Sequence, residues 1–531
     1  MTFSFLSAVV HVASLQAVFT WPYICAQAFA GVIAIVVWRK YFYNISDVPG
    51  PFLASFTRLW HLVRIFIGDQ NLRMIELHDK HGHFVRIADD EVSVSHPEAV
   101  RKLLLAPVPK VRLCPPAYLM AYHRLIIIIK GYWYSGTTIP DYRYIAPMSI
   151  CDPKAKIALS KALSPGYSQS NVLRYEPSIT RTIDGLLDWV EKYSQSKAPL
   201  SLDEFFAYTT FDVIGEVVFA KPFGFLEKGT DIGNSVANSE MLSFIAASAS
   251  FFPRLRNVLI SNPFMTWLGI LPLGHVFNTT MTAVKEREKN FDTNSQFVIV
   301  DHWLRTLRQQ PDRLHVRNVY AQATNNVGAG ADTVNSALQS FFYHLLRNPV
   351  ILEKAKKEID DAVNDGRCTS NVVSFSDAQQ LPYIQACIKE ALRFFAPVPM
   401  GLPRCVPSGG MTIGDRTFTE GTILSVNPWV IHRSPEIWGS DARIFVPERW
   451  LRDDAADLEK KYFIPFGAGY NSCPGHYIAK MELSKTTVTV LRDYDLKLVD
   501  ETREWQWRAN FTVVPKGWPV YVTKRVKETT V

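Results

Sequence analysis

The sequence predicts a mainly α-helical protein with a small β portion, built as a single large domain behind an N-terminal membrane anchor. Three observations support this class: a charge-free apolar N-terminus, long segments with helical periodicity, and short strand signals in only a few places. The chain has 531 residues, of which 47% are hydrophobic and 20% are charged. This composition allows a sizeable core and argues against wholesale disorder.

The N-terminal segment contains no Asp, Glu, Lys or Arg from residue 1 to residue 38. We expect an apolar tail over residues 1–17 and a transmembrane anchor over residues 18–38, because a bilayer core needs about 20 apolar residues in a helix. Arg39 and Lys40 follow at once and predict that the rest of the chain faces the cytosol. A cleaved signal peptide is the alternative, but the segment has no basic start and no clean small-residue cleavage site.

A short non-helical connection is predicted after the anchor. Residues 39–52 combine the basic flank with the stiff stretch DVPGPF, in which two prolines surround a glycine. No second linker, repeat or low-complexity tract follows, so residues 53–531 are expected to form one body.

The expected elements of this body follow from hydrophobic period and from Pro and Gly positions. Residues 84–100 predict two short strands and a helix that starts near His96 and Pro97. Residues 152–300 are mainly helical in period, with breaks at Pro165, Pro222 and Pro263. Further elements are long helices at 318–349 and 375–397, short strands within 402–427, and a helix from Pro474 to about Leu491. The apolar segment 125–144 has no clear period.

Charge and cysteine content narrow the functional classes. The net charge of +7 is spread along the chain without a basic stripe, which does not favour nucleic-acid binding. The seven cysteines are widely spaced and form no CxxC pair, which argues against a disulfide framework or a zinc site. We therefore expect a reduced, cytosol-facing protein in which few of the thiols do chemistry.

The stretch FGAGYNSCPGHYIA, residues 466–479, places Cys473 in a glycine-rich turn before a predicted helix. A thiolate there would meet the positive end of the helix dipole and unpaired backbone N–H groups, which predicts a lowered thiol pKa. Gly467, Gly469 and Gly475 would let a flat ligand approach the backbone. Such a cysteine can hold haem iron from one side. Taken alone, a single cysteine in a glycine loop is more often structural.

Three further constellations accompany this loop. Glu390 and Arg393 share one helical face at spacing i, i+3, which alone indicates only a surface pair. Arg449 lies in a short polar turn, residues 447–450. A Gly, an acid and a hydroxyl lie together in the middle of the long helix, within residues 329–333, and favour either a locally opened groove or a kinked core helix.

In their order and spacing, these motifs resemble the cytochrome P-450 family of haem-thiolate monooxygenases, most of all its fungal secondary-metabolism members. The residues that match the haem loop of that family are Phe466, Gly469, Cys473, Gly475 and Ala479. Glu390, Arg393 and Arg449 match its buried ion network, and Ala329 to Thr333 match its oxygen-groove motif. The resemblance covers nearly the whole chain and implies the cytochrome P-450 fold, with residues 53–531 as a haem-thiolate catalytic domain.

The resemblance also implies roles for single residues. Cys473 would be the axial ligand of the haem iron, with Phe466 packed near the sulfur side of the haem. Asp332 and Thr333 would act in oxygen activation and proton relay. Further residues are implied to bind the cofactor or to line a small, apolar substrate pocket: Gly469, Gly475, Arg404 and Lys156 for the haem, and Val327, Ala329, Gly330, Val398, Met400 and Gly401 for the substrate.

Two departures from the family pattern concern the haem propionates. Asn471 stands where most of the family has Arg or His, so that one charge-assisted bond is lost. Lys156 and Ser160 stand where related chains usually carry His and Arg. Lys156 is expected to supply the propionate charge as a point charge rather than as a fork.

The function implied is a haem b-dependent monooxygenase that oxidises a lipophilic small molecule, as a tailoring step in fungal secondary-metabolite biosynthesis. Dioxygen, the membrane and an NADPH-dependent flavoprotein reductase are the implied partners, with the chain anchored by a single N-terminal span in the endoplasmic reticulum membrane and its catalytic domain in the cytosol. Two alternatives remain: a haem-thiolate isomerase or dehydratase without external oxygen, and a non-catalytic membrane-anchored haem protein.

Overall fold

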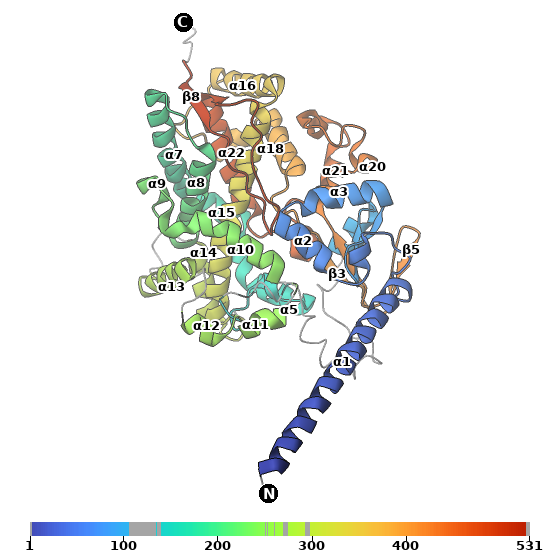
Figure 1. Cartoon of the computed structure of the whole chain (residues 1–531). Coiled ribbons are helices and arrows are strands. Elements are labelled where there is room, and N and C mark those ends of the chain that lie inside the picture. The colour runs from blue at the N-terminus through green and yellow to red at the C-terminus, as the bar shows by residue number, and fades with distance from the viewer. Residues whose placement is uncertain are drawn as a thin grey trace.

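The computed structural model describes residues 3–105, 134, 138, 140–249, 251, 253–259, 261–268, 274–291 and 298–526. It confirms a mainly helical body with little β structure (Figure 1). Of the segment 125–144, only residues 134, 138 and 140–144 belong to the described part of the chain.

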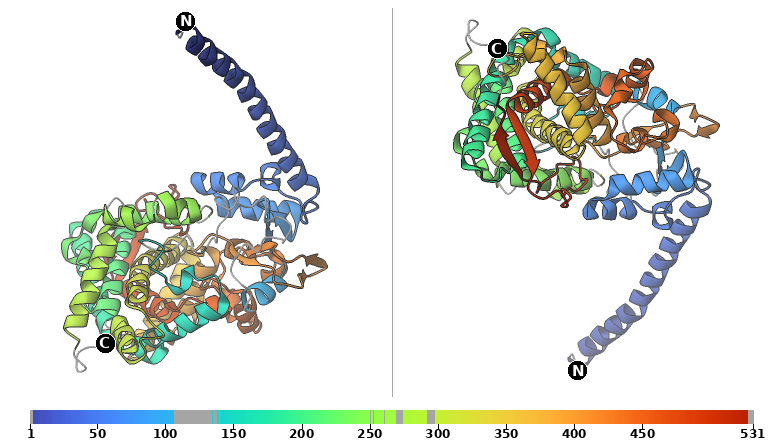
Figure 2. Two further views of the ribbon diagram at one scale, coloured as in Figure 1. Left: turned by 90° about the horizontal axis from the view of Figure 1, so that it is seen from below. Right: turned by 90° about the horizontal axis from the view of Figure 1, so that it is seen from above.

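The N-terminal helix α1 (Phe3–Tyr41) projects away from the body in every view (Figures 1 and 2). Residues Trp21–Tyr41 are long and apolar enough to cross a membrane, and the most apolar part of this stretch is not buried against the rest of the protein. The sequence predicted an apolar tail up to residue 17 and a transmembrane anchor from residue 18. The helix runs continuously through both and includes Pro22 in its interior.

The connection after α1 is irregular, as predicted, but it is packed against the body. The backbone N–H of Arg86 donates to the carbonyl oxygen of Pro49 at 2.8 Å. A Cβ on Gly50 would lie 2.2 Å from the carbonyl oxygen of Arg86, so only glycine permits this approach. Arg39 at the end of α1 also pairs with Asp89 at 2.9 Å. These contacts hold the C-terminal end of α1 and the segment after it against Arg86 and Asp89.

The helices of the body follow one another through most of the chain. The longer ones are α2 (Leu59–Ile67), α3 (Gln70–His81), α5 (Pro153–Leu163), α7 (Glu176–Ser196), α8 (Leu202–Phe219), α10 (Ser235–Ala249), α13 (Gly274–Lys289), α14 (Ile299–Gln309), α15 (Val316–Leu346), α16 (Pro349–Asn364), α18 (Pro382–Phe394), α21 (Ala455–Tyr462) and α22 (His476–Asp493). Shorter ones are α6 (Gln169–Arg174), α9 (Phe225–Lys228), α11 (Pro253–Leu259), α12 (Pro263–Trp267), α17 (Phe375–Gln379), α19 (Pro428–Ile431) and α20 (Pro435–Trp438), with η2 (Val100–Leu105) as a π-helix and the 3₁₀ turns η1 (Phe52–Ser55), η5 (Pro147–Ser149), η6 (Ser164–Tyr167), η7 (Ile232–Asn234), η8 (Pro447–Leu451) and η9 (Gly469–Asn471).

The described strands form three small sheets. One sheet has the order β1-β2-β6-β3, in which only the β2–β6 pairing is parallel. Its strands are β1 (Phe84–Arg86), β2 (Glu91–Val94), β6 (Ile423–Val426) and β3 (Leu402–Cys405). The two-stranded sheets are β4 (Met411–Ile413) with β5 (Arg416–Phe418), and β7 (Tyr494–Leu498) with β8 (Val520–Lys524).

The long helix α15 runs through the body and packs against α8, α18 and α22 (Figure 1). Its C-terminal half is buried on nearly all sides, and the buried residues include Phe341 and Phe342 as well as the polar Asn335 and Gln339. One large core cluster therefore joins α7, α8, α14, α15, α18 and α22. This core holds the helices that carry the candidate site at fixed positions.

Two predicted boundaries need correction. The helix expected over 375–397 is divided into α17 and α18, since Pro382 begins a new helix at its first turn instead of continuing the old one. The helix expected from Pro474 begins at His476, with Gly475 at its N-cap. The long helix expected at 318–349 is confirmed as α15.

Candidate active site

Cys473 lies in a tight turn that leads into α22. The turn is closed by the backbone N–H of Cys473, which donates to the carbonyl oxygen of Phe466 at 2.8 Å. Gly467 and Gly469 adopt left-handed φ values of +67° and +62°, which glycine tolerates without strain. The backbone of this turn therefore depends on its glycines.

The close approach of η2 also requires a residue without a side chain at position 469. A Cβ on this residue would lie only 2.4 Å from the carbonyl oxygen of Leu104. On the other side of the turn, a Cβ on Gly475 would lie 3.9 Å from the sulfur of Cys473. The glycines thus keep the loop narrow and leave the region beside the thiol free of side chains, which fits a flat ligand.

The Cys473 side chain is exposed, unlike the buried thiols of Cys368, Cys387 and Cys405. The sequence predicted a lowered thiol pKa, and this needs correction. Although the side chain reaches solvent, the protein atoms packed around the thiol desolvate it and raise the pKa of Cys473, and the N–H of Gly475 lowers it only in part. One backbone N–H does not outweigh desolvation in the protein alone, so a bound cation would have to stabilise the thiolate.

A cationic group lies beside this loop. Arg404 is 1% exposed, and its Nη1 donates to the hydroxyl of Tyr134 at 2.9 Å. Lys156 donates to the carbonyl oxygen of Tyr470, and burial together with the nearby Arg404 lowers the pKa of Lys156 to about 8. Within the described residues, neither cation forms an ion pair with a carboxylate.

Orphaned polar atoms accompany these cations. The Nε of Arg404 and both amide atoms of Asn471 are buried and have no hydrogen-bond partner among the described residues. Unpaired buried donors of this kind cost free energy unless a ligand satisfies them. Two cations and an amide beside the cysteine loop therefore fit an anionic, carboxylate-bearing ligand. Tyr134, which the sequence analysis did not single out, belongs to this group.

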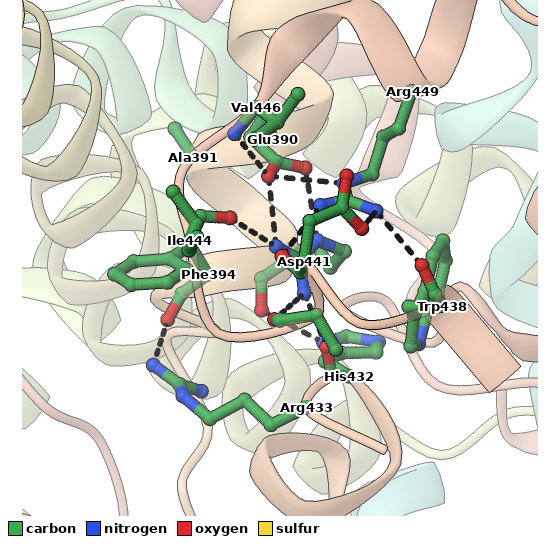
Figure 3. A network of polar contacts seen from close by, with 12 residues as sticks. Glu390, Ala391, Phe394, His432, Arg433, Trp438, Asp441, Ile444, Val446 and Arg449 are labelled. Atoms are coloured by element: carbon green, nitrogen blue, oxygen red, sulfur yellow. Dashed lines mark hydrogen bonds and ion pairs between the residues drawn. The ribbon is translucent and has the colours of Figure 1, made fainter. Parts of the chain in front are cut away.

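Glu390, Arg393 and Arg449 form a buried ion network, as the family resemblance implied. Figure 3 shows this network around Glu390 and Arg449. The carboxylate of Glu390 accepts from Arg393 Nε at 2.9 Å and Nη2 at 2.8 Å, and from Arg449 Nε at 3.1 Å. The indole N–H of Trp450 and the backbone N–H of Val446 complete its bonds at 3.0 and 2.8 Å. All three charged side chains are at most 1% exposed, so this is not the surface pair that the spacing alone indicated.

The network extends to residues that the sequence did not indicate. Asp441 accepts from Arg449 Nη1 at 3.1 Å and from Arg452 at 3.0 Å. Arg393 Nη1 donates to the carbonyl oxygens of Ala442 and His432. His432 in turn bridges two segments, since its Nε2 accepts from the backbone N–H of Ile464 at 3.0 Å while its Nδ1 lies 3.2 Å from the carbonyl oxygen of Arg393. The segment that leads into the cysteine loop is thus tied to the network.

Asp332 and Thr333 lie in the middle of α15, where neither side chain is fully buried. The hydroxyl of Thr333 donates to the carbonyl oxygen of Ala329 at 2.7 Å. The carboxyl group of Asp332 is surrounded by protein, and burial raises its pKa to about 6, although hydrogen bonds from Ser239 and Thr512 lower it. A carboxyl group that titrates near neutral pH suits proton transfer.

The six residues assigned to the substrate pocket differ in their burial and in their neighbours. Ala329 is exposed, but Val327 is buried in the main core at 2% exposure. A Cβ on Gly330 would lie 2.4 Å from Cδ1 of Ile214, so this residue faces α8. Val327 and Gly330 lie on faces of α15 that pack against neighbouring residues, and their assignment to a substrate pocket stays a prediction.

After α18, the chain places the remaining three pocket candidates differently. Val398 is half-buried, and Met400 is buried beside Tyr134 and Ala247 of α10. Gly401 lies against Ser425 of β6, where a Cβ would meet the serine side chain at 3.1 Å. Met400 thus belongs to the same buried cluster as the tyrosine that bonds Arg404.

Comparison with known proteins agrees with these motifs. The family model described as cytochrome P450 matches residues 154–518. The chain is 28% identical to the cytochrome P450 monooxygenase cicH of Emericella nidulans, over 93% of this chain and 97% of that protein. It is 29% identical to gsfF of Penicillium aethiopicum, over 93% and 98%, and 30% identical to hepC of Aspergillus oryzae, over 89% and 92%, both named cytochrome P450 monooxygenases.

Proposed function

Because the chain belongs to the cytochrome P450 family, we propose that it is a haem b-dependent monooxygenase that hydroxylates, epoxidises or further oxidises a lipophilic small molecule. The observation that carries the proposal is the exposed Cys473 in a narrow glycine turn, beside two cations that lack a carboxylate partner in the described part of the chain. The three relatives named above come from fungi, which favours a tailoring step in secondary-metabolite biosynthesis.

The residues of this chain fit a haem. Cys473 would provide the sulfur ligand of the haem iron, with the turn from Phe466 to Gly475 supporting the thiol. Arg404, Lys156 and the unpaired amide of Asn471 would hold the propionates, with Asn471 contributing neutral bonds that are weaker than those of an arginine. Bound haem supplies the activation of dioxygen and the oxidation of the substrate, and thiolate ligation favours cleavage of the O–O bond.

Protons reach the reaction through α15 in this proposal. With a pKa of about 6, the carboxyl group of Asp332 can accept a proton from water at neutral pH and pass it on from the same oxygen. Thr333, next in the chain, offers a hydroxyl group that is bonded to Ala329 in the protein alone. Its hydroxyl can donate to one partner and accept from another, as a relay requires.

The side chains assigned to the substrate pocket favour a lipophilic substrate. Ala329, Val398 and Met400 are small or apolar and present no charge to a bound molecule. Such a lining excludes water and binds apolar surface. A lipophilic substrate is also consistent with a chain held at a membrane by α1.

We further propose that α1 anchors the protein in the endoplasmic reticulum membrane, with the catalytic domain in the cytosol. Trp21–Tyr41 provides the span, and Arg39 and Lys40 provide the positive flank. Electrons would come from NADPH through a membrane-bound flavoprotein reductase.

The test uses the full chain purified in detergent. After reduction and treatment with carbon monoxide, the wild type should show the red-shifted Soret band of thiolate-ligated haem, and Cys473→Ala should not. Turnover is then measured with a reductase, NADPH and a panel of lipophilic compounds. A thiolate-type band that survives in Cys473→Ala would overturn the haem assignment. Product formation without NADPH and dioxygen would point to an isomerase or dehydratase instead.

A further inference from the structure

The side chain of Asp332 is held by hydroxyl groups from two distant segments of the chain. On one side is Ser239 of α10, whose Oγ lies 2.5 Å from both Oδ1 and Oδ2 of Asp332. On the other side is Thr512, in the segment before β8, whose Oγ1 lies 3.4 Å from Oδ2. We name Ser239, Thr512 and Ser243 the hydroxyl clamp.

Ser243 joins the two sides of the clamp. It lies one turn after Ser239 on α10, and its hydroxyl oxygen lies 2.9 Å from Oγ1 of Thr512. The backbone N–H of Thr512 also donates to Oγ of Ser243 at 2.8 Å, and the backbone N–H of Phe511 donates to the carbonyl oxygen of Ser243 at 3.3 Å. Thr512 and Ser243 are both buried. The clamp is therefore a connected set of hydrogen bonds with a fixed geometry.

Three charged groups in the elements around Asp332 are bonded to other partners. Glu240, next to Ser239 on α10, pairs with Lys516 of the C-terminal segment at 2.9 Å. On α8, Glu216 pairs with Arg181 at 3.0 Å, and Asp212 accepts three backbone N–H groups of residues 224–226. Among the described residues no cation forms an ion pair with Asp332, and the shift of its pKa has only burial and the two hydroxyl bonds as causes.

A neutral hydroxyl partner differs from a cation in one respect that matters for a proton carrier. Lysine and arginine only donate, so they would stabilise the ionised carboxylate and hold its pKa low. A serine hydroxyl donates to the carboxylate and can turn to accept from the protonated carboxyl group. It can therefore keep the carboxyl group in one position through both protonation states.

We propose that Ser239 is a positioning residue for Asp332, which holds its carboxyl group in place in both protonation states, with Thr512 as its weaker second support. This inference rests on the proposed function, in which Asp332 moves protons. Ser239 acts through Asp332 and has no direct part in the reaction.

The first experiment follows the carboxyl group itself by infrared titration of the haem-loaded full chain, with Asp332→Asn as the reference for its band. Removal of the Ser239 hydroxyl should raise the midpoint, because the bond it donates favours the ionised form. We expect Ser239→Ala to titrate about one pH unit above the wild type, as loss of a hydrogen bond to a charged group predicts. Ser239→Thr should restore the wild-type midpoint.

Ser248→Ala is the matched control on the same helix, because among the described residues the Ser248 hydroxyl bonds only the carbonyl oxygen of Phe244 on α10, at 2.8 Å. It should titrate like the wild type. If Ser239→Ala does not load haem, Thr512→Val provides the second variant, with a smaller upward shift expected. An unchanged midpoint in a correctly loaded Ser239→Ala or Thr512→Val would overturn the inference.

The second experiment measures the role in the reaction without a known substrate. Reductase-fed oxidation of NADPH and release of hydrogen peroxide are followed against pH. The midpoint of this profile should move upward in Ser239→Ala together with the infrared midpoint, and an unmoved profile would overturn the positioning role. A wild type without the thiolate-type carbon monoxide spectrum would instead refute the proposed function, while the infrared titration would still test the clamp.

Discussion

Replacement of Glu390 by glutamine removes the negative charge that Arg393 and Arg449 share. Glutamine has nearly the same shape, so packing is preserved and the electrostatic change dominates. Arg393 is fully buried and retains only carbonyl oxygens as acceptors, whereas Arg449 retains Asp441. The perturbation therefore leaves one guanidinium group without any carboxylate.

The magnitude follows from the burial of that group. Breaking a buried ion pair by removing one partner costs about 3–5 kcal/mol, because a charge is left in a poorly solvated place. We expect a loss near the lower limit, about 3 kcal/mol, since the carbonyl oxygens of His432, Ala442 and Ile444 still accept from Arg393. This free energy corresponds to roughly a hundredfold change in the folding equilibrium.

The assay is urea unfolding of the haem-loaded chain, followed by circular dichroism and by the Soret band. Arg449→Met and the double variant complete a double-mutant cycle, in which the two losses should not add because both residues belong to one network. Asp457→Asn is the control, since it breaks an exposed pair with Lys461 and should have no measurable effect. A loss below about 1 kcal/mol for Glu390→Gln, with haem retained, would refute the assignment of a stabilising network.

Three further predictions concern other sites. Glu482 is 1% exposed, both its carboxyl oxygens lack a partner among the described residues, and burial alone raises its pKa well above 4.5. The folded chain therefore keeps a proton on Glu482 that the unfolded chain releases, so the stability of the fold falls as the pH rises above 4.5. Glu482→Gln should raise the urea midpoint of unfolding more at pH 8 than at pH 5. An equal gain at both pH values would contradict this prediction. Gly469→Ala should lower the free energy of unfolding by more than about 2 kcal/mol and reduce haem loading, because the strain of a left-handed backbone adds to the clash with Leu104. Gly366 has a similar φ but no atom within 4 Å of its added Cβ, so Gly366→Ala should show the effect of the strain alone. Lys156→Met should speed the transfer of haem to a haem-free globin several-fold, and an unchanged rate would remove Lys156 from the propionate site.

Local order in the sequence explains which parts of the fold could be predicted. The long helix α15 was expected within three residues of its observed ends, because its apolar period and the Asn348–Pro349 stop are local features. The helix over 375–397 was predicted as one element, although Pro382 begins a separate helix. The period of 3.6 residues continues on both sides of this proline, so the pattern gives no sign of the break.

The same distinction between local and long-range features applies to the residues of the candidate site. Glu390 and Arg393 are three residues apart on one helix, and the cysteine turn is contained within about ten residues, so chemistry and spacing were enough to propose them. Tyr134 and Ser239 reach their partners only through long-range contacts, and no short motif marks them. The thiol pKa of Cys473 was expected in the wrong direction, because desolvation depends on every neighbouring segment.

By itself, the sequence determined the helical class, the glycine turn around one cysteine and the order of the motifs, because these depend on backbone preferences within a few residues. The tertiary structure decided which face of α15 lies open, which charges are buried and which hydroxyl groups hold Asp332. Those outcomes depend on burial and on the distances between atoms far apart in the chain, and a linear pattern of residues contains neither.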